Sequence, residues 1–209
     1  MKIVCVSDTH CRLSKIDIGE GSVLIHSGDL TFDGSILQVA QEMHQLKKAK
    51  NHFNHILFVP GNHDWLFQTN QTLAEEICKD ALLHEREVVI DGVKFYGTAW
   101  QPEFCGWAYN LDRGSNQLIE AYKRIPNDTN VLITHTPPMY KLDDLMHGGN
   151  VGCYDLAMRI KELKQLKIHA FGHIHFSYGS LTEGEITYIN SSICDEGYKP
   201  INQPIVVTI

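Results

Sequence analysis

Five segments of this chain share one pattern, in which a short β-branched, apolar run ends in a turn that carries Asp, Asn or His. The five turns contain Asp8-Thr9-His10, Gly28-Asp29, Gly61-Asn62-His63-Asp64, His135 and Gly172-His173-Ile174-His175. Residues that follow the strands of an α/β sheet lie at one edge, where the backbone turns outward and ligands tend to bind. A fold that accommodates all five segments is therefore expected to gather these polar side chains at one edge.

Ten short apolar runs bounded by Gly, Pro, Asp, Asn or Ser are typical of β-strands. They cover residues 2–7, 23–27, 56–59, 88–90, 93–97, 131–134, 168–171, 178–181, 186–189 and 205–209. Apolar residues at helical spacing predict four helices. These contain Ile36 to Phe53 after Asp33 as N-cap, Leu73 to Leu82 after Asn70, Leu118 to Tyr122, and Leu156 to Leu166. Early strands alternate with helices and the last part is mostly strand, which predicts a mixed α/β fold.

The chain is expected to form a single domain over residues 1–209. Its 209 residues suffice for one well-buried core, and no repeat, low-complexity tract or linker-like stretch divides them.

Carboxylate, amide and imidazole groups together predict a divalent cation site, because these ligands suit Mn²⁺, Fe²⁺, Zn²⁺ or Mg²⁺ better than a metal that prefers thiolates. Seven candidate ligands are more than one ion needs and match two ions that share a carboxylate: Asp8, His10, Asp29, Asn62, His135, His173 and His175. Pairs two residues apart, such as Asp8 and His10, project to the same side in extended geometry. Two such ions would form a cationic pocket in a chain of net charge −7, and this pocket suits an anionic phosphate.

In this order, the five blocks resemble the calcineurin-like metallophosphoesterase superfamily, whose pattern is D-x-H, G-D, G-N-H-D/E, a lone His after a strand, and G-H-x-H. The resemblance implies an α/β fold of two mixed β-sheets packed as a sandwich and flanked by helices. It also implies two divalent ions, with Mn²⁺ or Fe²⁺ as first choice and Mg²⁺, Ni²⁺ or Zn²⁺ as alternatives. One ion would be held by Asp8, His10, Asp29 and His175, and the other by Asp29, Asn62, His135 and His173.

The same resemblance assigns His63 to catalysis rather than to metal binding. His63 would donate to the leaving oxygen or steady charge on the phosphate, and Asp64 would orient its ring. The expected mechanism is attack by a metal-bridging hydroxide, because two cations lower the pKa of a bridging water toward about 7. It requires no serine or cysteine nucleophile, and inversion at phosphorus is expected.

Differences from the sequence patterns of other branches of this superfamily narrow the choice of substrate. Phe32 stands where purple acid phosphatases place a tyrosine, and residues 28–34 lack the arginine of Ser/Thr protein phosphatases. A longer match, over residues 7–12, 28–31, 95–114, 134–138 and 151–156, resembles the metallophosphoesterase-domain-containing (MPPED-type) proteins. That branch is similar to class III cyclic nucleotide phosphodiesterases, which implies hydrolysis of a phosphodiester in a cyclic or small nucleotide.

The aromatic residues of the 95–114 block offer a stacking face for a nucleobase. They are Trp100, Phe104, Trp107 and Tyr109. The alternative is that they close the core over a short loop. Arg12 and Arg113 are candidate contacts to phosphate or ribose, with a solvent-facing role as the alternative, and His147 is a further candidate for lining the pocket.

Composition excludes several function classes. The net charge of −7 argues against a sequence-independent grip on duplex nucleic acid, and no window approaches the roughly 18 apolar residues of a membrane span. The first residues are too short an apolar run for a signal peptide, and six scattered cysteines without a C-x-x-C pair indicate reduced thiols in the cytoplasm.

Two alternatives stay open. One is a phosphomonoesterase, nucleotidase or general nuclease of the same superfamily. The other is a binding scaffold that kept the fold and lost catalysis. Retention of all the expected site residues weighs against the scaffold.

Overall fold

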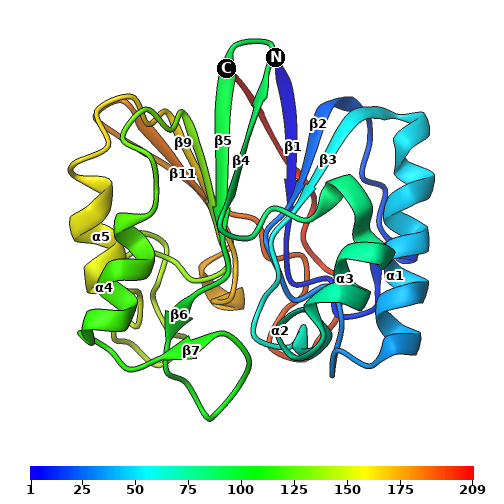
Figure 1. Cartoon of the computed structure of the whole chain (residues 1–209), viewed down its shortest axis with the longest axis horizontal. Coiled ribbons are helices and arrows are strands. Elements are labelled where there is room, and N and C mark those ends of the chain that lie inside the picture. The colour runs from blue at the N-terminus through cyan, green and yellow to red at the C-terminus, as the bar shows by residue number, and fades with distance from the viewer.

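Two β-sheets face each other in the computed structural model, which describes residues 1–209 (Figure 1). The four-stranded sheet has the order β12-β1-β2-β3, with β1 Lys2–Val6, β2 Gly21–His26, β3 Phe53–Phe58 and β12 Ile205–Thr208. Strands β1, β2 and β3 are parallel, and β12 runs antiparallel to β1. The two chain ends meet at the outer end of this sheet, where the Met1 amino group donates to the Ile209 carbonyl.

The six-stranded sheet is also mixed, with the order β10-β11-β9-β8-β5-β4. Its strands are β4 Arg86–Ile90, β5 Val93–Thr98, β8 Val131–Thr134, β9 Ile168–Phe171, β10 Gly179–Glu183 and β11 Ile186–Asn190. The four inner strands are parallel and the two edge strands antiparallel. A separate two-stranded ribbon pairs β6 Gln101–Pro102 with β7 Asn110–Leu111.

Helices cover the outer faces of both sheets, α1 and α3 beside the four-stranded sheet and α4 and α5 beside the six-stranded one (Figure 1). The α-helices are α1 Ile36–Lys48, α2 Trp65–Thr69, α3 Gln71–Cys78, α4 Asn116–Lys123 and α5 Tyr154–Ile160. Single 3₁₀ turns lie at η1 Leu13–Lys15, η2 Ala49–Asn51, η3 Lys79–Ala81 and η4 His175–Ser177. None of these helices is long and apolar enough to cross a lipid bilayer.

Side-chain alternation in the six-stranded sheet builds two cores from one set of strands. Phe95 and Ile133 point inward and join the main cluster of 36 buried residues, which also takes residues from the four-stranded sheet and from α1. Their neighbours Tyr96 and Leu132 point outward and join a second cluster of 12 with residues of α4 and α5. Successive side chains of a strand face opposite sides, so apolar residues on both faces bury the inner strands β8 and β9 completely. The predicted fold class of two mixed sheets flanked by helices is therefore confirmed.

Helix boundaries differ from the sequence prediction. Helix α1 ends at Lys48, and Phe53 opens strand β3, where its buried side chain joins the main core. The N-cap residue of α1 is Ser35, and Asp33 instead accepts a hydrogen bond from the Ser35 amide. Leu163 and Leu166 lie beyond the end of α5, although both pack in the outer cluster. Asn70 caps α3 as predicted, accepting from the Leu73 amide at 3.2 Å.

His169 in strand β9 is a fully buried histidine with one unpaired ring nitrogen. The Thr134 hydroxyl donates to the Thr136 carbonyl at 2.7 Å. The Nε2–H of His169 must therefore donate to the Thr134 Oγ1 atom, 2.9 Å away. The Nδ1 atom has no partner, and burial lowers the pKa of His169 to about 3.

We expect His169 to make folding less stable in mild acid. The unfolded chain takes up a proton here near the ordinary histidine pKa of 6.5, whereas the folded chain does so only near 3. The free energy of unfolding should therefore fall by about 2 kcal/mol from this group alone between about pH 6.5 and about pH 5. His169→Leu should remove that part of the pH dependence in urea denaturation, and the exposed His52→Leu should not. An unchanged pH dependence in His169→Leu would contradict the assignment.

Candidate metal centre

The candidate ligands lie where strands of both sheets end. Asp8 and His10 follow β1, Asp29 follows β2, Asn62 follows β3, His135 follows β8, and His173 and His175 follow β9. Backbone hydrogen bonds join the two sheets at this end. The Ser7 amide donates to the Ser191 carbonyl and the Ile193 amide donates to the Ser7 carbonyl, both at 2.9 Å. Two sheets that are tied together here present the strand ends to one shared space.

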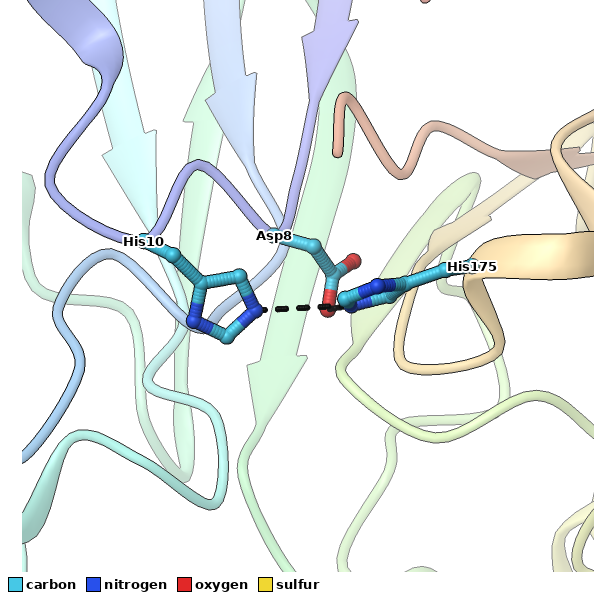
Figure 2. A group of neighbouring side chains, drawn as sticks. All are labelled: Asp8, His10 and His175. Carbon is cyan, nitrogen blue, oxygen red and sulfur yellow. Dashed lines mark hydrogen bonds and ion pairs between the residues drawn. The ribbon is translucent and has the colours of Figure 1, made fainter. Parts of the chain in front are cut away.

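Asp8, His10 and His175 form one group of potential metal ligands. Figure 2 shows the two imidazole rings and the carboxylate pointing toward one another from the β1 and β9 ends. The Nε2 atom of His175 is 3.3 Å from Asp8 Oδ1 and 3.4 Å from the Nε2 atom of His10. Two ring nitrogens at this distance face a common point, as ligands of one cation do.

Asp29 lies between the first group and a second one. Its Oδ2 atom is 3.7 Å from His10 Nε2, and its Oδ1 atom is 3.3 Å from His135 Nε2. The Asn62 Oδ1 atom lies 2.9 Å from the same His135 nitrogen. Atoms of Asp8, Asp29 and His135 all lie within 4.8 Å of one another. One carboxylate thus faces imidazoles on both sides.

Backbone carbonyls fix the orientation of these imidazole rings. The Nδ1 atoms of His10, His135 and His175 donate to the carbonyls of Thr31, Ser27 and Asp195 at 3.3, 2.9 and 2.9 Å. Donation from Nδ1 leaves Nε2, the other ring nitrogen, facing the cluster. This is how metal-binding histidines are commonly held.

The two carboxylates of the cluster are buried together without a lysine or arginine partner. Asp8 and Asp29 are 0% and 2% exposed, and their ion pairs are all with histidines. Burial alone would raise the pKa of Asp8, but the hydrogen bond and charge of His175 lower it well below its ordinary value. Burial of Asp29 is likewise outweighed by His135, so its pKa is also lowered. Two buried negative charges need strong compensation, and the donor set fits a divalent cation.

Two histidines of the cluster are basic enough to hold a proton in the metal-free protein. Burial lowers the pKa of His135, but Asp29 outweighs it and raises the value to about 9. The pKa of His175 rises to about 9 against its burial through the hydrogen bond to Asp8. Metal binding would displace these protons, since only the neutral ring is a ligand.

Strained backbone holds several of these residues. The φ angles of Asp8, His10, Asp29 and His173 are 51°, 41°, 52° and 70°, a region that costs energy for a side chain with a Cβ atom. The expectation that Asp8 and His10 converge through extended geometry is therefore wrong. They converge because the chain turns in left-handed conformation directly after β1.

His173 lies at the margin of the cluster. Its amide donates to Asp8 Oδ2 at 3.0 Å, and its ring centroid is 5.0 Å from that of His135. It therefore approaches the side of the cluster that holds Asn62 and His135, whereas His175 approaches the side that holds Asp8.

His63 is oriented differently from the sequence prediction. Its Nδ1 atom donates to the Phe32 carbonyl at 2.6 Å, and its ring stacks on Trp107 with centroids 4.3 Å apart. The Nε2 atom is then 3.8 Å from Asp29 Oδ2. The prediction that Asp64 orients this ring is wrong, because the Phe32 carbonyl makes that hydrogen bond.

Asp64 instead holds the loop that carries Asp29. Its carboxylate accepts from the amides of Leu30, Thr31 and Gly61 at 3.2, 3.0 and 2.9 Å, and from the Thr31 hydroxyl at 2.7 Å. Burial and the charge of Asp29 raise the pKa of Asp64 to about 6, against the effect of these hydrogen bonds. The residue thereby ties the β2 loop to the β3 loop.

A pocket of about 590 Å³ opens above the cluster, and it contains some of the predicted substrate residues. Phe104, Arg113 and His147 line it. Trp107 does not line it but supports His63 from behind.

Three other residues lie elsewhere. Trp100 donates to Glu85 and packs on His84, and its proposed stacking on a base is wrong because it belongs to a separate surface hollow. Tyr109 is buried in the main core. Arg12 lies over the Phe32 ring at 5.3 Å, outside the pocket lining.

Sequence reasoning missed Tyr198 and Glu196, which also line the pocket. They lie in a turn after β11, beyond the last of the five blocks, and no strand-end motif marks them. The Tyr198 ring is perpendicular to that of His10, with centroids 4.7 Å apart. Burial, followed by the charges of Asp29 and Asp8, raises the pKa of its phenol.

Two facing mixed sheets with carboxylate, amide and imidazole groups at five strand ends define a metallophosphoesterase type of protein. Residues 1–177 match the family model described as calcineurin-like phosphoesterase. The chain belongs to this family, and it is a phosphoester hydrolase of a family that uses divalent metal ions.

Sequence similarity to known proteins extends over the whole chain. It is 34% identical to human metallophosphoesterase domain-containing protein 1 over 234 aligned residues, covering 100% of this chain and 71% of the human one. It is 35% identical to a UPF0046 protein of Caenorhabditis elegans, with 100% and 75% covered. The crystal structure of TT1561 from Thermus thermophilus superposes with a TM-score of 0.61 at 16% identity, covering 90% of this chain and 88% of that one. The similarity to TT1561 shows that the two proteins share a fold.

Gly172 should be essential for the geometry around Asp8. A Cβ atom at this position would overlap Asp8 Oδ2 and Ser7 Oγ, although its φ angle lies outside the left-handed region. We expect Gly172→Ala to weaken Mn²⁺ binding by about tenfold or more in calorimetric titration. Gly197→Ala, whose Cβ atom would meet nothing closer than 3.3 Å, serves as the control. Equal Mn²⁺ affinity in both variants would show that Asp8 is not a ligand.

Proposed function

We propose that the protein hydrolyses a phosphodiester of a cyclic or other small nucleotide, using two divalent cations that share Asp29. One observation carries this proposal. The Asp29 carboxylate has His10 on one side and His135 on the other, at 3.7 and 3.3 Å. A buried carboxylate between two sets of inward-facing imidazoles is suited to bridging two ions.

Two sets of residues would hold the ions. Asp8, His10 and His175 would hold one and Asn62, His135 and His173 the other, with Asp29 common to both. Bound divalent cations would supply a nucleophilic water at neutral pH and positive charge for the phosphate oxygens. Mn²⁺ and Fe²⁺ suit this mixture of oxygen and imidazole ligands.

His63 would act at the leaving oxygen. The Phe32 carbonyl accepts the Nδ1 proton, and Trp107 covers one face of the ring, so the ring has a single orientation. Its Nε2 atom is thereby directed toward the side of Asp29 that faces the pocket. Because Nδ1–H is already given to Phe32, donation from Nε2 requires the doubly protonated ring, and in that form His63 can give a proton or a hydrogen bond to the leaving oxygen as the ester bond breaks.

The pocket lining favours a diester over a phosphate with two negative charges. Arg113 is the only lysine or arginine in the lining, and both of its terminal nitrogens donate to the carbonyls of Val151 and Gly152. Phe104, Met146 and Phe176 are about half exposed at the same opening. Such a wall suits a flat, apolar group such as a nucleobase next to a singly charged phosphate.

We place this activity in the cytoplasm and in a single domain over residues 1–209. All six cysteines are unpaired, which suits a reducing compartment. The main core takes residues from both sheets, as one folding unit requires.

Metal removal tests the function directly. We expect chelated protein to leave a chromogenic phosphodiester intact and to regain turnover with Mn²⁺ or Fe²⁺, because the ions provide the nucleophile. The loaded enzyme should then cleave 2′,3′- or 3′,5′-cyclic nucleotides faster than mononucleotides. Preference for mononucleotides would favour the nucleotidase alternative. Mn²⁺ binding without turnover of any ester, with Fe²⁺, Ni²⁺ and Mg²⁺ also ineffective, would favour the binding scaffold.

Replacing His63 separates catalysis from metal binding. His63→Ala should retain both ions by elemental analysis and lower kcat by about a hundredfold or more, because the donor to the leaving oxygen is lost. The exposed His52→Ala is the matched control and should behave as wild type. Loss of an ion from His63→Ala would mean that this ring is a ligand.

A further inference from the structure

Tyr198 reaches the candidate metal centre from a part of the chain that lies beyond the residues matched by the family model, which end at 177. Its ring is perpendicular to the rings of His10 and His175, with centroids 4.7 and 5.9 Å apart. It also contacts Phe32 at a centroid distance of 5.1 Å. A phenol therefore lines the pocket next to two candidate metal ligands.

The turn that carries Tyr198 is closed by its own hydrogen bonds. The Asp195 amide donates to the Lys199 carbonyl and the Tyr198 amide donates to the Asp195 carbonyl, both at 2.9 Å. The Asp195 carboxylate accepts from the amides of Gly197 and Lys199 at 2.9 and 2.8 Å. Because the Asp195 carbonyl also accepts from His175 Nδ1 at 2.9 Å, the turn is fixed directly to the centre.

This turn holds Tyr198 in an unfavourable backbone conformation. Its φ angle is 58°, in the left-handed region where a residue with a Cβ atom is strained. Strain of this kind persists only where surrounding contacts enforce it, and it is concentrated at functional sites. The aromatic contacts with His10 and Phe32 and the hydrogen bonds of the turn provide that enforcement.

The Tyr198 hydroxyl is available to a ligand. The hydroxyls of Tyr122 and Tyr178 donate to the backbone carbonyls of Trp100 and Gln203. Tyr198 makes no such bond within the chain, and 36% of the residue is exposed. The only guanidinium of the pocket lining, that of Arg113, is already bonded to backbone carbonyls. The phenol O–H of Tyr198 is a neutral donor in the same lining and is free to serve a phosphate oxygen that faces the pocket.

We propose that Tyr198 is a catalytic residue whose phenol O–H donates a hydrogen bond to a non-bridging oxygen of the substrate phosphate. This inference rests on the proposed phosphoesterase function and assigns to it a donor outside the five strand-end blocks. The acceptor oxygen is charged, so the hydrogen bond is of the stronger kind. His63 and Tyr198 have ring centroids 6.4 Å apart, so the leaving oxygen and a non-bridging oxygen of one phosphate could each receive a donor.

Tyr198→Phe tests the proposal, because it removes the hydroxyl and keeps the ring against His10 and Phe32. We expect Mn²⁺ binding and thermal stability to match wild type. Inorganic phosphate should bind the Mn²⁺-loaded variant about tenfold more weakly in calorimetric titration, and kcat/KM for a phosphodiester should fall by a similar factor. Tyr154→Phe, at a residue that is 60% exposed and outside the pocket lining, is the matched control.

Two outcomes would overturn the proposal. Phosphate affinity within twofold of wild type would mean that the hydroxyl does not contact phosphate. Weaker Mn²⁺ binding in Tyr198→Phe would mean that the residue supports the metal centre instead. Phosphate binding is measured without turnover, so a wild-type protein that hydrolyses no ester would contradict the proposed function and still leave the comparison between Tyr198→Phe and Tyr154→Phe decisive.

Discussion

The arrangement of the centre depends on how the negative charges of two buried carboxylates are balanced. Asp8 and Asp29 lie at the junction of the two sheets, almost without exposure, and their ion pairs are all with imidazoles. Removing a charge from water is costly unless an opposite charge and hydrogen bonds replace the solvent. The chain meets this requirement with ring nitrogens aimed inward, each held by a backbone carbonyl on its other side. The same arrangement that tolerates two negative charges is the one that a divalent cation would complete.

A stiff frame makes this arrangement possible. The parallel strands of both sheets end at the centre, and the Ser7–Ser191 and Ser7–Ile193 backbone hydrogen bonds join them there. Backbone hydrogen bonds between the β1 and β2 loops, such as that from the His10 amide to the Asp29 carbonyl at 3.0 Å, help to hold the left-handed conformations of both residues. Asp64 makes the frame stiffer, because its hydrogen bonds join the β2 loop to the β3 loop. Local strain is thus balanced by the cooperative stability of the sheets.

The surroundings of the centre differ on its two sides. Toward the interior lie the buried ligands and their carbonyl partners. Toward solvent lies a pocket with apolar side chains such as Phe104 and Phe176, and its one guanidinium is already bonded to the backbone. Membership of the calcineurin-like phosphoesterase family defines the reaction class. The proposed choice of phosphate ester rests on this apolar opening and on Tyr198.

The fold class, the strand ends that meet at the centre and the set of candidate ligands could all be predicted from the amino-acid sequence. This was possible because strand runs are local patterns, and because the ends of parallel strands must share one edge. The group that orients His63, the position of Trp100 away from the pocket and the start of a strand at Phe53 became evident only in the folded chain. Those outcomes depend on contacts between distant segments, such as the Phe32 carbonyl with His63. Tyr198 shows this most clearly, because nothing local to residues 195–199 reveals that their turn closes over His10 and His175.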